Sequence, residues 1–173
     1  MTALLGRLAL AVVVLALAGQ AAAHEIRHPA RGTPAFAADI PDDWTREVDT
    51  DHNLIVTSAD SATSFVFSLG SFSGPLKVAA EQMLGVAGAS PPSAETAISL
   101  SGLAGFTYDS TMAVHGDAPL KLTMTIVRFR EKGFMSCTRL ERAGASHQQR
   151  QLADTVMGSL RIIHSGETTR SRQ

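Results

Sequence analysis

Hydrophobic and polar residues alternate along several short stretches of the first half of the chain. In residues 64–69 (SFVFSL) the alternation places Phe65, Phe67 and Leu69 on one face, as in a half-buried strand. Further extended stretches cover residues 36–40, 44–48 and 54–57. Short polar clusters with the composition of tight turns separate these stretches. The pattern predicts an antiparallel meander.

The spacing changes to that of a helix after residue 74. Apolar residues then recur at three- and four-residue intervals, at Leu76, Ala79, Ala80, Met83, Leu84 and Ala87. We expect Ser73 to cap the N-terminus, Pro75 to lie in the first turn and Gly88 to end the helix. One amphipathic helix is therefore predicted between Ser73 and Gly88.

A second helix is predicted near the C-terminal end. Ser146 and Gln149 form a capping-box pair, in which each side chain covers a free backbone N–H of the first turn. The apolar stripe that follows consists of Leu152, Ala153, Val156, Met157 and Leu160. After residue 163 the chain is polar, and we expect residues 164–173 to form a disordered tail.

Four longer strands are expected between the helices, at residues 96–100, 105–114, 120–130 and 133–142. Alternation gives two of them an apolar face, made of Phe106, Tyr108, Met112 and Val114 on one strand and of Leu120, Leu122, Met124 and Ile126 on the next. Their other faces carry Thr107, Asp109, Thr111, Lys121, Thr123 and Thr125. We expect the apolar side to lie beneath a helix and the threonine-rich side to face water. The alternative is that the threonine-rich side lines a ligand cleft.

The order of elements indicates the fold class. Strands, a helix, more strands and a last helix follow one another without the alternation of βαβ units. This order predicts an α+β domain, in which helices sandwich an antiparallel sheet.

The first 23 residues have the features of a secretory signal peptide. Arg7 precedes an unbroken apolar run over residues 8–18, and an A-x-A sequence ends at Ala23. The run is shorter than the roughly 20 residues that a spanning helix needs. We therefore expect cleavage after Ala23, no transmembrane anchor afterwards and a periplasmic or extracellular location. The remaining chain is expected to comprise a flexible leader at 24–33, a single domain at 34–163 and the tail.

Composition excludes several classes of function. The chain has 15 Lys and Arg residues against 16 Asp and Glu residues, so it lacks the basic excess of a nucleic-acid-binding domain. A single cysteine, Cys137, excludes an intrachain disulfide framework and is expected in the core. The basic residues at 128–142 are interleaved with Glu131 and Glu141 and predict a solvated hairpin end.

Residues His24, Glu25 and His28 match the H-E-x-x-H motif of zinc proteases. That motif needs a helix, which Pro29 and the adjacent cleavage site disfavour. Cleavage after Ala23 would instead leave an N-terminal histidine, whose amine and imidazole could chelate copper, with His28 as a further ligand. The alternative is a polar leader without a metal.

Several short segments resemble the PsbP-like domain family, named for the extrinsic subunit of photosystem II. They are residues 40–44 (IPDDW), the helix after the second hairpin, residues 100–105 (LSGLAG) and residues 156–160 (VMGSL). The resemblance covers residues 36–163 and implies an antiparallel sheet between helices. The family includes many exported bacterial proteins, and no functional residue is carried over from it.

We therefore expect a secreted, non-enzymatic binding or accessory domain that docks to a protein or cell-envelope partner. One alternative is copper or other metal handling through His24 and His28. The other is a small-ligand carrier, or an unrecognised hydrolase, that uses the threonine-rich face.

Overall fold

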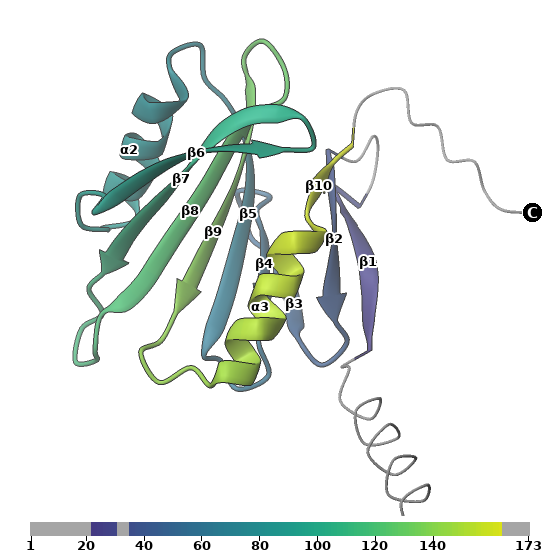
Figure 1. The fold of residues 1–173 in the computed structure, drawn as a ribbon, viewed down its shortest axis with the longest axis vertical. Coiled ribbons are helices and arrows are strands. Elements are labelled where there is room, and N and C mark those ends of the chain that lie inside the picture. Colours follow the sequence, from purple (N-terminus) through teal and green to yellow (C-terminus); the bar gives the residue numbers. More distant parts are fainter. Residues whose placement is uncertain (1–21, 31–34, 164–173) are drawn as a thin grey trace, which may run out of the picture.

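Seven antiparallel strands form the larger of two sheets in the computed structural model, which describes residues 22–30 and 35–163. Figure 1 shows this strongly twisted sheet from its β6 edge to its β3 edge. In spatial order its strands are β3 (Thr45–Val48), β4 (Leu54–Thr57), β5 (Thr63–Ser71), β9 (Gly133–Glu141), β8 (Leu120–Arg128), β7 (Leu103–Met112) and β6 (Ala94–Leu100). Neighbouring strands are mostly joined by tight turns, as the closely spaced alternating segments predicted.

A smaller sheet brings the two ends of the described chain together. It has the order β1 (Ala23–His28), β2 (Phe36–Pro41) and β10 (Arg161–Ile162), and both outer strands are antiparallel to β2. Glu25 of β1 also forms an ion pair with Arg161 of β10. Because β2 is central in this sheet and lies against the core, five of its six residues are buried.

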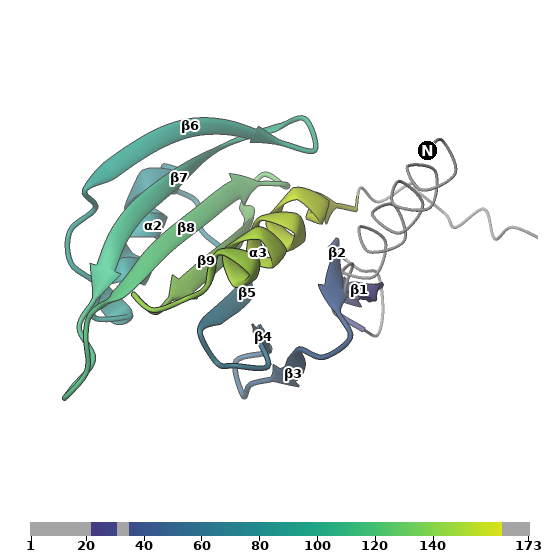
Figure 2. The same cartoon turned by 60° about the horizontal axis from the view of Figure 1, so that its bottom comes forward.

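The two helices cover opposite faces of the larger sheet (Figures 1 and 2). Helix α2 (Leu76–Val86) packs over β7 and β8, where Ala80 and Leu84 contact a cluster that contains Tyr108 and Met124. Helix α3 (His147–Ser159) packs on the other face and against β2. The core on that side consists of residues from β2, β4, β5, β8, β9, α3 and β10 together with Trp44 and Leu160.

These layers confirm the predicted α+β fold. The apolar faces predicted for the central strands are confirmed in their middle, since Tyr108, Leu122, Met124 and Ile126 are buried in the cluster beneath α2. Towards the strand ends the prediction was too long, because β7 ends at Met112, and Val114 and Leu120 lie outside this cluster. The opposite face is only partly open to water: Thr125 is buried, whereas Thr111 is exposed.

The N-terminal segment differs from the expected leader. Ala23–His28 forms a strand that pairs with β2 along its whole length, and residues 31–34 lie outside the described part of the chain. The side chains of His24, Ile26 and His28 alternate with Glu25 and Arg27. Ile26 packs against the core, and the His28 ring lies tilted against Phe36 with 5.4 Å between ring centroids, which stabilises the strand.

The helix caps are confirmed in part. The N-cap of α2 is Pro75, with no side-chain hydrogen bond, so Ser73 does not cap this helix as predicted. Ser146 does cap α3, because its hydroxyl accepts a hydrogen bond from the Gln149 N–H at 3.2 Å. The reciprocal half of the capping box is absent, since Oε1 of Gln149 is buried without a partner within the described residues.

The expected signal peptide and tail lie almost wholly outside the described residues. Among residues 22–30 and 35–163, no helix is long and apolar enough to cross a membrane.

Candidate functional site

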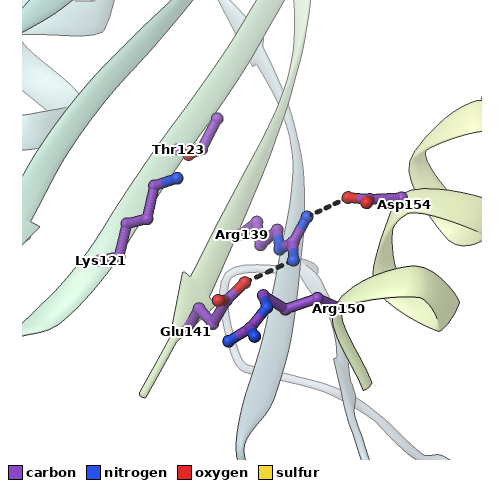
Figure 3. Close-up of a pocket in the computed structure, with 6 residues that line it drawn as sticks. All are labelled: Lys121, Thr123, Arg139, Glu141, Arg150 and Asp154. Carbon is purple, nitrogen blue, oxygen red and sulfur yellow. Dashed lines mark hydrogen bonds and ion pairs between the residues drawn. The ribbon is translucent and has the colours of Figure 1, made fainter. Parts of the chain in front are cut away.

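Charged side chains line a pocket between α3 and the adjacent face of the larger sheet. Its volume is about 200 Å³. Figure 3 shows that Lys121 and Thr123 reach it from β8, Arg139 and Glu141 from β9, and Arg150 and Asp154 from α3. We call this the charged pocket. Lys121 and Thr123 belong to the threonine-rich face that the sequence offered as a possible ligand cleft.

Arg139 is the central residue of the charged pocket. Its guanidinium forms ion pairs with Glu141 and with Asp154, the latter with 2.6 Å between Nη1 and Oδ1. The Arg139 and Glu141 side chains are only 16% and 12% exposed, so the sheet carries a largely desolvated ion pair. Asp154 is 72% exposed and connects the same guanidinium to α3. Arg139 therefore holds the helix to the sheet, and it is far more buried than the solvated hairpin end predicted from the sequence.

Two further cations at the pocket form no ion pair with a carboxylate in the described part of the chain. Arg150 donates a hydrogen bond to the Ala145 carbonyl oxygen at 2.6 Å. Lys121 is exposed, and its neighbour Thr123 donates to Asp109 at 2.8 Å. Arg150 also lies near the N-terminal end of α3, whose first turn contains no acidic residue. Since the helix dipole is positive at that end, the arrangement favours a small anion there.

An apolar groove lies on the other side of the molecule, beside α2. It has a volume of about 390 Å³. Its apolar lining consists of Phe72, Ala79, Met83, Val86, Ala87 and Phe134, and we call it the α2 groove. Val86 is 91% exposed and is the most exposed large hydrophobic residue described. The groove is therefore the candidate docking surface on this side of the molecule, because exposed apolar surface that a partner can cover is a feature of binding sites.

Backbone contacts fix the shape of the α2 groove. Phe134 packs over Gly70 of β5, in a space that a Cβ atom at residue 70 would occupy. The Phe72 N–H donates to the Lys132 carbonyl oxygen at 2.7 Å, and Arg128 donates to the Phe72 carbonyl oxygen at 2.8 Å. The aromatic residues on this side are therefore held by the sheet, independently of any ligand.

The two histidines of the expected metal site lie on the same strand but are not brought together. Four residues of extended chain separate them by about 13 Å. The Nδ1 atom of His24 is 2.5 Å from the Asp42 carboxylate, and its Nε2 atom contacts Arg46. His28 is buried and donates from Nε2 to the His52 carbonyl oxygen at 3.0 Å. A metal at His24 would have to displace these partners, and copper binding stays a prediction.

The described residues show no metal-ligand cluster and no reactive thiol. They contain no group of three or more His, Cys, Asp and Glu residues that could hold a metal ion. The zinc-protease motif falls in β1 and lacks the helix that its spacing requires. Cys137 is fully buried, as predicted, and burial raises the pKa of its thiol well above the ordinary value.

Neither the charged pocket nor the α2 groove was identified from the sequence as a complete site. Val86 lies off the predicted apolar stripe of α2, so a valine expected on the exposed side of the helix was the signal in the sequence for the groove. The charged pocket depends on where α3 crosses β9. Spacing along the sequence does not contain that information.

Comparison with known proteins shows the fold but no family. No protein-family profile matches the chain, and no curated protein matches it. Among solved structures, cyanobacterial PsbP (CyanoP) from Synechocystis sp. PCC 6803 is similar, with a TM-score of 0.60 and 12% identity over 84% of this chain and 95% of CyanoP. LpqN, described as involved in cell envelope biogenesis of Mycobacterium tuberculosis, gives a TM-score of 0.59 and 14% identity over 83% of this chain and 91% of LpqN.

A crystal structure from Bacteroides thetaiotaomicron VPI-5482 gives a TM-score of 0.52 at 16% identity. This match covers 78% of the present chain but only 47% of that one, so the chain spans about half the length of the Bacteroides protein. At such identities the shared property is the fold. The chain has an α+β fold of the type found in CyanoP and LpqN.

Proposed function

We propose that this protein is a non-enzymatic accessory domain of the bacterial cell envelope that docks to a partner protein through the α2 groove. The observation that carries the proposal is the groove itself, with Val86 91% exposed beside Phe72 and Met83. An apolar side chain of a partner would fill the groove and remove this surface from water, as anchor residues do at the centres of protein interfaces.

The shared fold supports an envelope role. LpqN is described as involved in cell envelope biogenesis, and this chain shares its fold along most of its length. Membership of the PsbP-like family and export to the periplasm or cell exterior belong to this proposal. Export predicts that the mature protein begins at His24, which the intact mass of protein purified from its own cell would test.

Site-specific photocrosslinking tests the docking surface. A photoreactive amino acid replaces Gln82, an exposed residue that lines the α2 groove. We expect it to capture one discrete protein, and Val86→Asp to abolish the capture. Val86→Asp should also raise the dissociation constant of the purified partner roughly tenfold or more, since an apolar anchor is replaced by a charge.

The matched control uses the other strongly exposed valine. Val48 lies on β3 and is 56% exposed, so Val48→Asp adds the same charge away from the groove and should leave capture unchanged. Capture of the same proteins from a photoreactive residue at position 48, or undiminished capture in Val86→Asp, would refute docking through the groove.

A second candidate function is that of a small-ligand carrier, which the charged pocket favours. Lys121 and Arg150 converge there without carboxylate partners among the described residues, so the ligand would be a small carboxylate or phosphate. Titration with inorganic phosphate and with acetate, followed by amide chemical shifts, should show saturable binding that is lost in Arg150→Met and kept in Asp154→Asn. Unsaturable shifts, or equal binding by both variants, would count against a carrier.

A further inference from the structure

The edge strand β6 has few of the features that normally protect a sheet edge. It has seven residues and pairs in the described structure only with β7, without a break in register from Ala94 to Leu100. Its one charged residue, Glu95, forms an ion pair with Lys77 of α2 at 3.2 Å. Five of the seven residues are exposed. Figure 2 shows β6 as the outermost strand of the sheet, with its free edge directed away from β7.

The opposite edge of the same sheet is protected in the usual way. Strand β3 has only four residues, and Arg46 and Glu47 supply two charges. Short length, charges, prolines and bulges are the devices by which proteins prevent strands from adding to a sheet edge. Strand β6 contains no lysine, arginine, proline or bulge. The molecule therefore blocks one edge of the larger sheet and leaves the other open.

The turn after β6 determines which of its backbone groups are free. Ser101 and Gly102 both have positive φ angles, of 52° and 78°, as in the two-residue type I′ turn of a hairpin. The residues that flank such a turn exchange backbone hydrogen bonds, and the bonds then recur at alternate pairs. Starting from Leu100, this alternation directs the N–H and C=O groups of Glu95, Ala97 and Ser99 to the open edge.

The hairpin is also anchored at its turn, so the free edge is held in place. The Ile162 N–H of β10 donates a hydrogen bond to Oγ of Ser101 at 2.9 Å. At the other end of β6, the Ser93 N–H donates to the Asp109 carbonyl oxygen at 2.8 Å. An edge that is fixed at both ends loses little conformational entropy when a further strand pairs with it.

We propose that β6 pairs with β6 of a second copy of this chain, antiparallel about a two-fold axis at Ala97. In this register Ala97 lies opposite Ala97 of the second copy, and Glu95 lies opposite Ser99. Each strand directs the backbone N–H and C=O groups of Glu95, Ala97 and Ser99 toward the other copy. In this register each of these groups lies opposite a hydrogen-bonding partner. The dimer joins the two seven-stranded sheets into one continuous sheet.

Side-chain chemistry along the strand fits this self-pairing. No like charges lie opposite one another, because each Glu95 faces a serine. On the other face of the sheet Thr96 lies opposite Ile98, and pairs of β-branched residues stabilise neighbouring strands. Ala97, which meets its own copy at the axis, is exposed in the described structure and small enough for close approach.

Charge substitutions at the axis test the dimer. Sedimentation equilibrium of the full mature chain should show a dimer for the wild type. Ala97→Lys and Ala97→Glu each place two like charges opposite one another and should raise the dimer dissociation constant roughly tenfold or more. Mixing the two variants places a lysine opposite a glutamate, and the mixture should form a heterodimer. Val48→Lys adds the same charge to the β3 edge and should leave the dimer intact.

Circular dichroism and thermal unfolding of each variant control for folding, and the heterodimer itself requires that both variants be folded. A wild-type chain that is still monomeric at about 100 μM, where a dimer stabilised by roughly 5.5 kcal/mol would be half formed, would overturn the proposal. A persistent dimer in Ala97→Lys, or no recovery on mixing, would do the same. These outcomes do not depend on the α2 groove, so the dimer and the proposed docking function can fail separately.

Discussion

Gly105 marks a place where two central strands approach too closely for a side chain. It lies in β7 opposite Val127 of β8. A Cβ atom at residue 105 would overlap the carbonyl oxygen of Ile126 and lie 2.6 Å from Cγ1 of Val127. The first of these neighbours is backbone in the middle of a sheet, so it cannot move aside as a flexible side chain could. The requirement for glycine here comes from packing rather than from an unusual φ angle.

Gly105→Ala should therefore lower the free energy of unfolding by about 1–3 kcal/mol, the usual range for overpacking a core. Chemical denaturation measures the change. Gly158→Ala is the matched control: Gly158 lies in α3 with nothing within 4 Å of its would-be Cβ, so alanine should be neutral or stabilising by up to about 1 kcal/mol. Equal destabilisation by both substitutions would contradict the close approach of β7 and β8.

At the scale of elements, polar contacts supplement the apolar packing of α3 at three places along its length. Ser146 covers a free N–H at the start of the helix, and Asp154 connects its middle to Arg139 of β9. At the other end, Oγ of Ser159 accepts a hydrogen bond from the Asp39 N–H of β2 at 2.8 Å. The helix is thus attached to both sheets, and its contact with β9 fixes the charged pocket between α3 and the larger sheet.

Ser146→Ala should cost about 1 kcal/mol of unfolding free energy, because it leaves a first-turn N–H without a partner. Gln149→Ala should cost much less, since the Gln149 side chain does not complete the capping box and alanine favours helix. Denaturation of the two variants compares them directly. If Gln149→Ala were as costly as Ser146→Ala, a full capping box would be present in solution.

Elements that depend on local periodicity could be predicted from the sequence. The stripe with Ala153 and Val156 and the apolar face with Leu122 and Met124 are repeating local patterns, and the structure buries them as expected. Strand β1 was missed because Ile26 is the only aliphatic residue between its two histidines. Its strand character comes from pairing with β2, which is a non-local interaction.

The candidate sites were less predictable than the fold for the same reason. The alternation of side chains along β9 determines which face Arg139 occupies, but the burial of Arg139 depends on where α3 crosses the sheet. The sequence places Val86 off the apolar stripe of α2, but the groove beside it depends on how α2 packs against Phe72 and Phe134. Both positions follow from the packing of elements that are distant in the sequence.

At the scale of the whole molecule, the reactivity of the Cys137 thiol measures how often the folded structure opens. The residue lies in the middle of β9, fully buried, with Sγ 3.4 Å from Sδ of Met157 on α3. Burial raises the pKa of its thiol, so the reactive thiolate is scarce in the folded state as well as inaccessible. Access requires α3 to leave the sheet.

A thiol reagent should therefore modify Cys137 in the native protein more slowly than in the denatured protein, by a factor on the order of 10³ or more. The rate should rise with denaturant in parallel with loss of the folded signal. Protein in concentrated denaturant gives the reference rate of the free thiol. Rapid modification under native conditions would show that α3 separates from the sheet without global unfolding.

The smaller sheet has a mechanical consequence. Strands β1 and β10 flank β2 and are both antiparallel to it, so they run parallel to one another. Tension applied at the start of β1 and the end of β10 pulls these two strands lengthwise in opposite directions. The hydrogen bonds on the two sides of β2 are then loaded in shear and share the force, whereas a peeling geometry would break them one after another. The three-stranded sheet is thus the part of the molecule that first bears a stretching load.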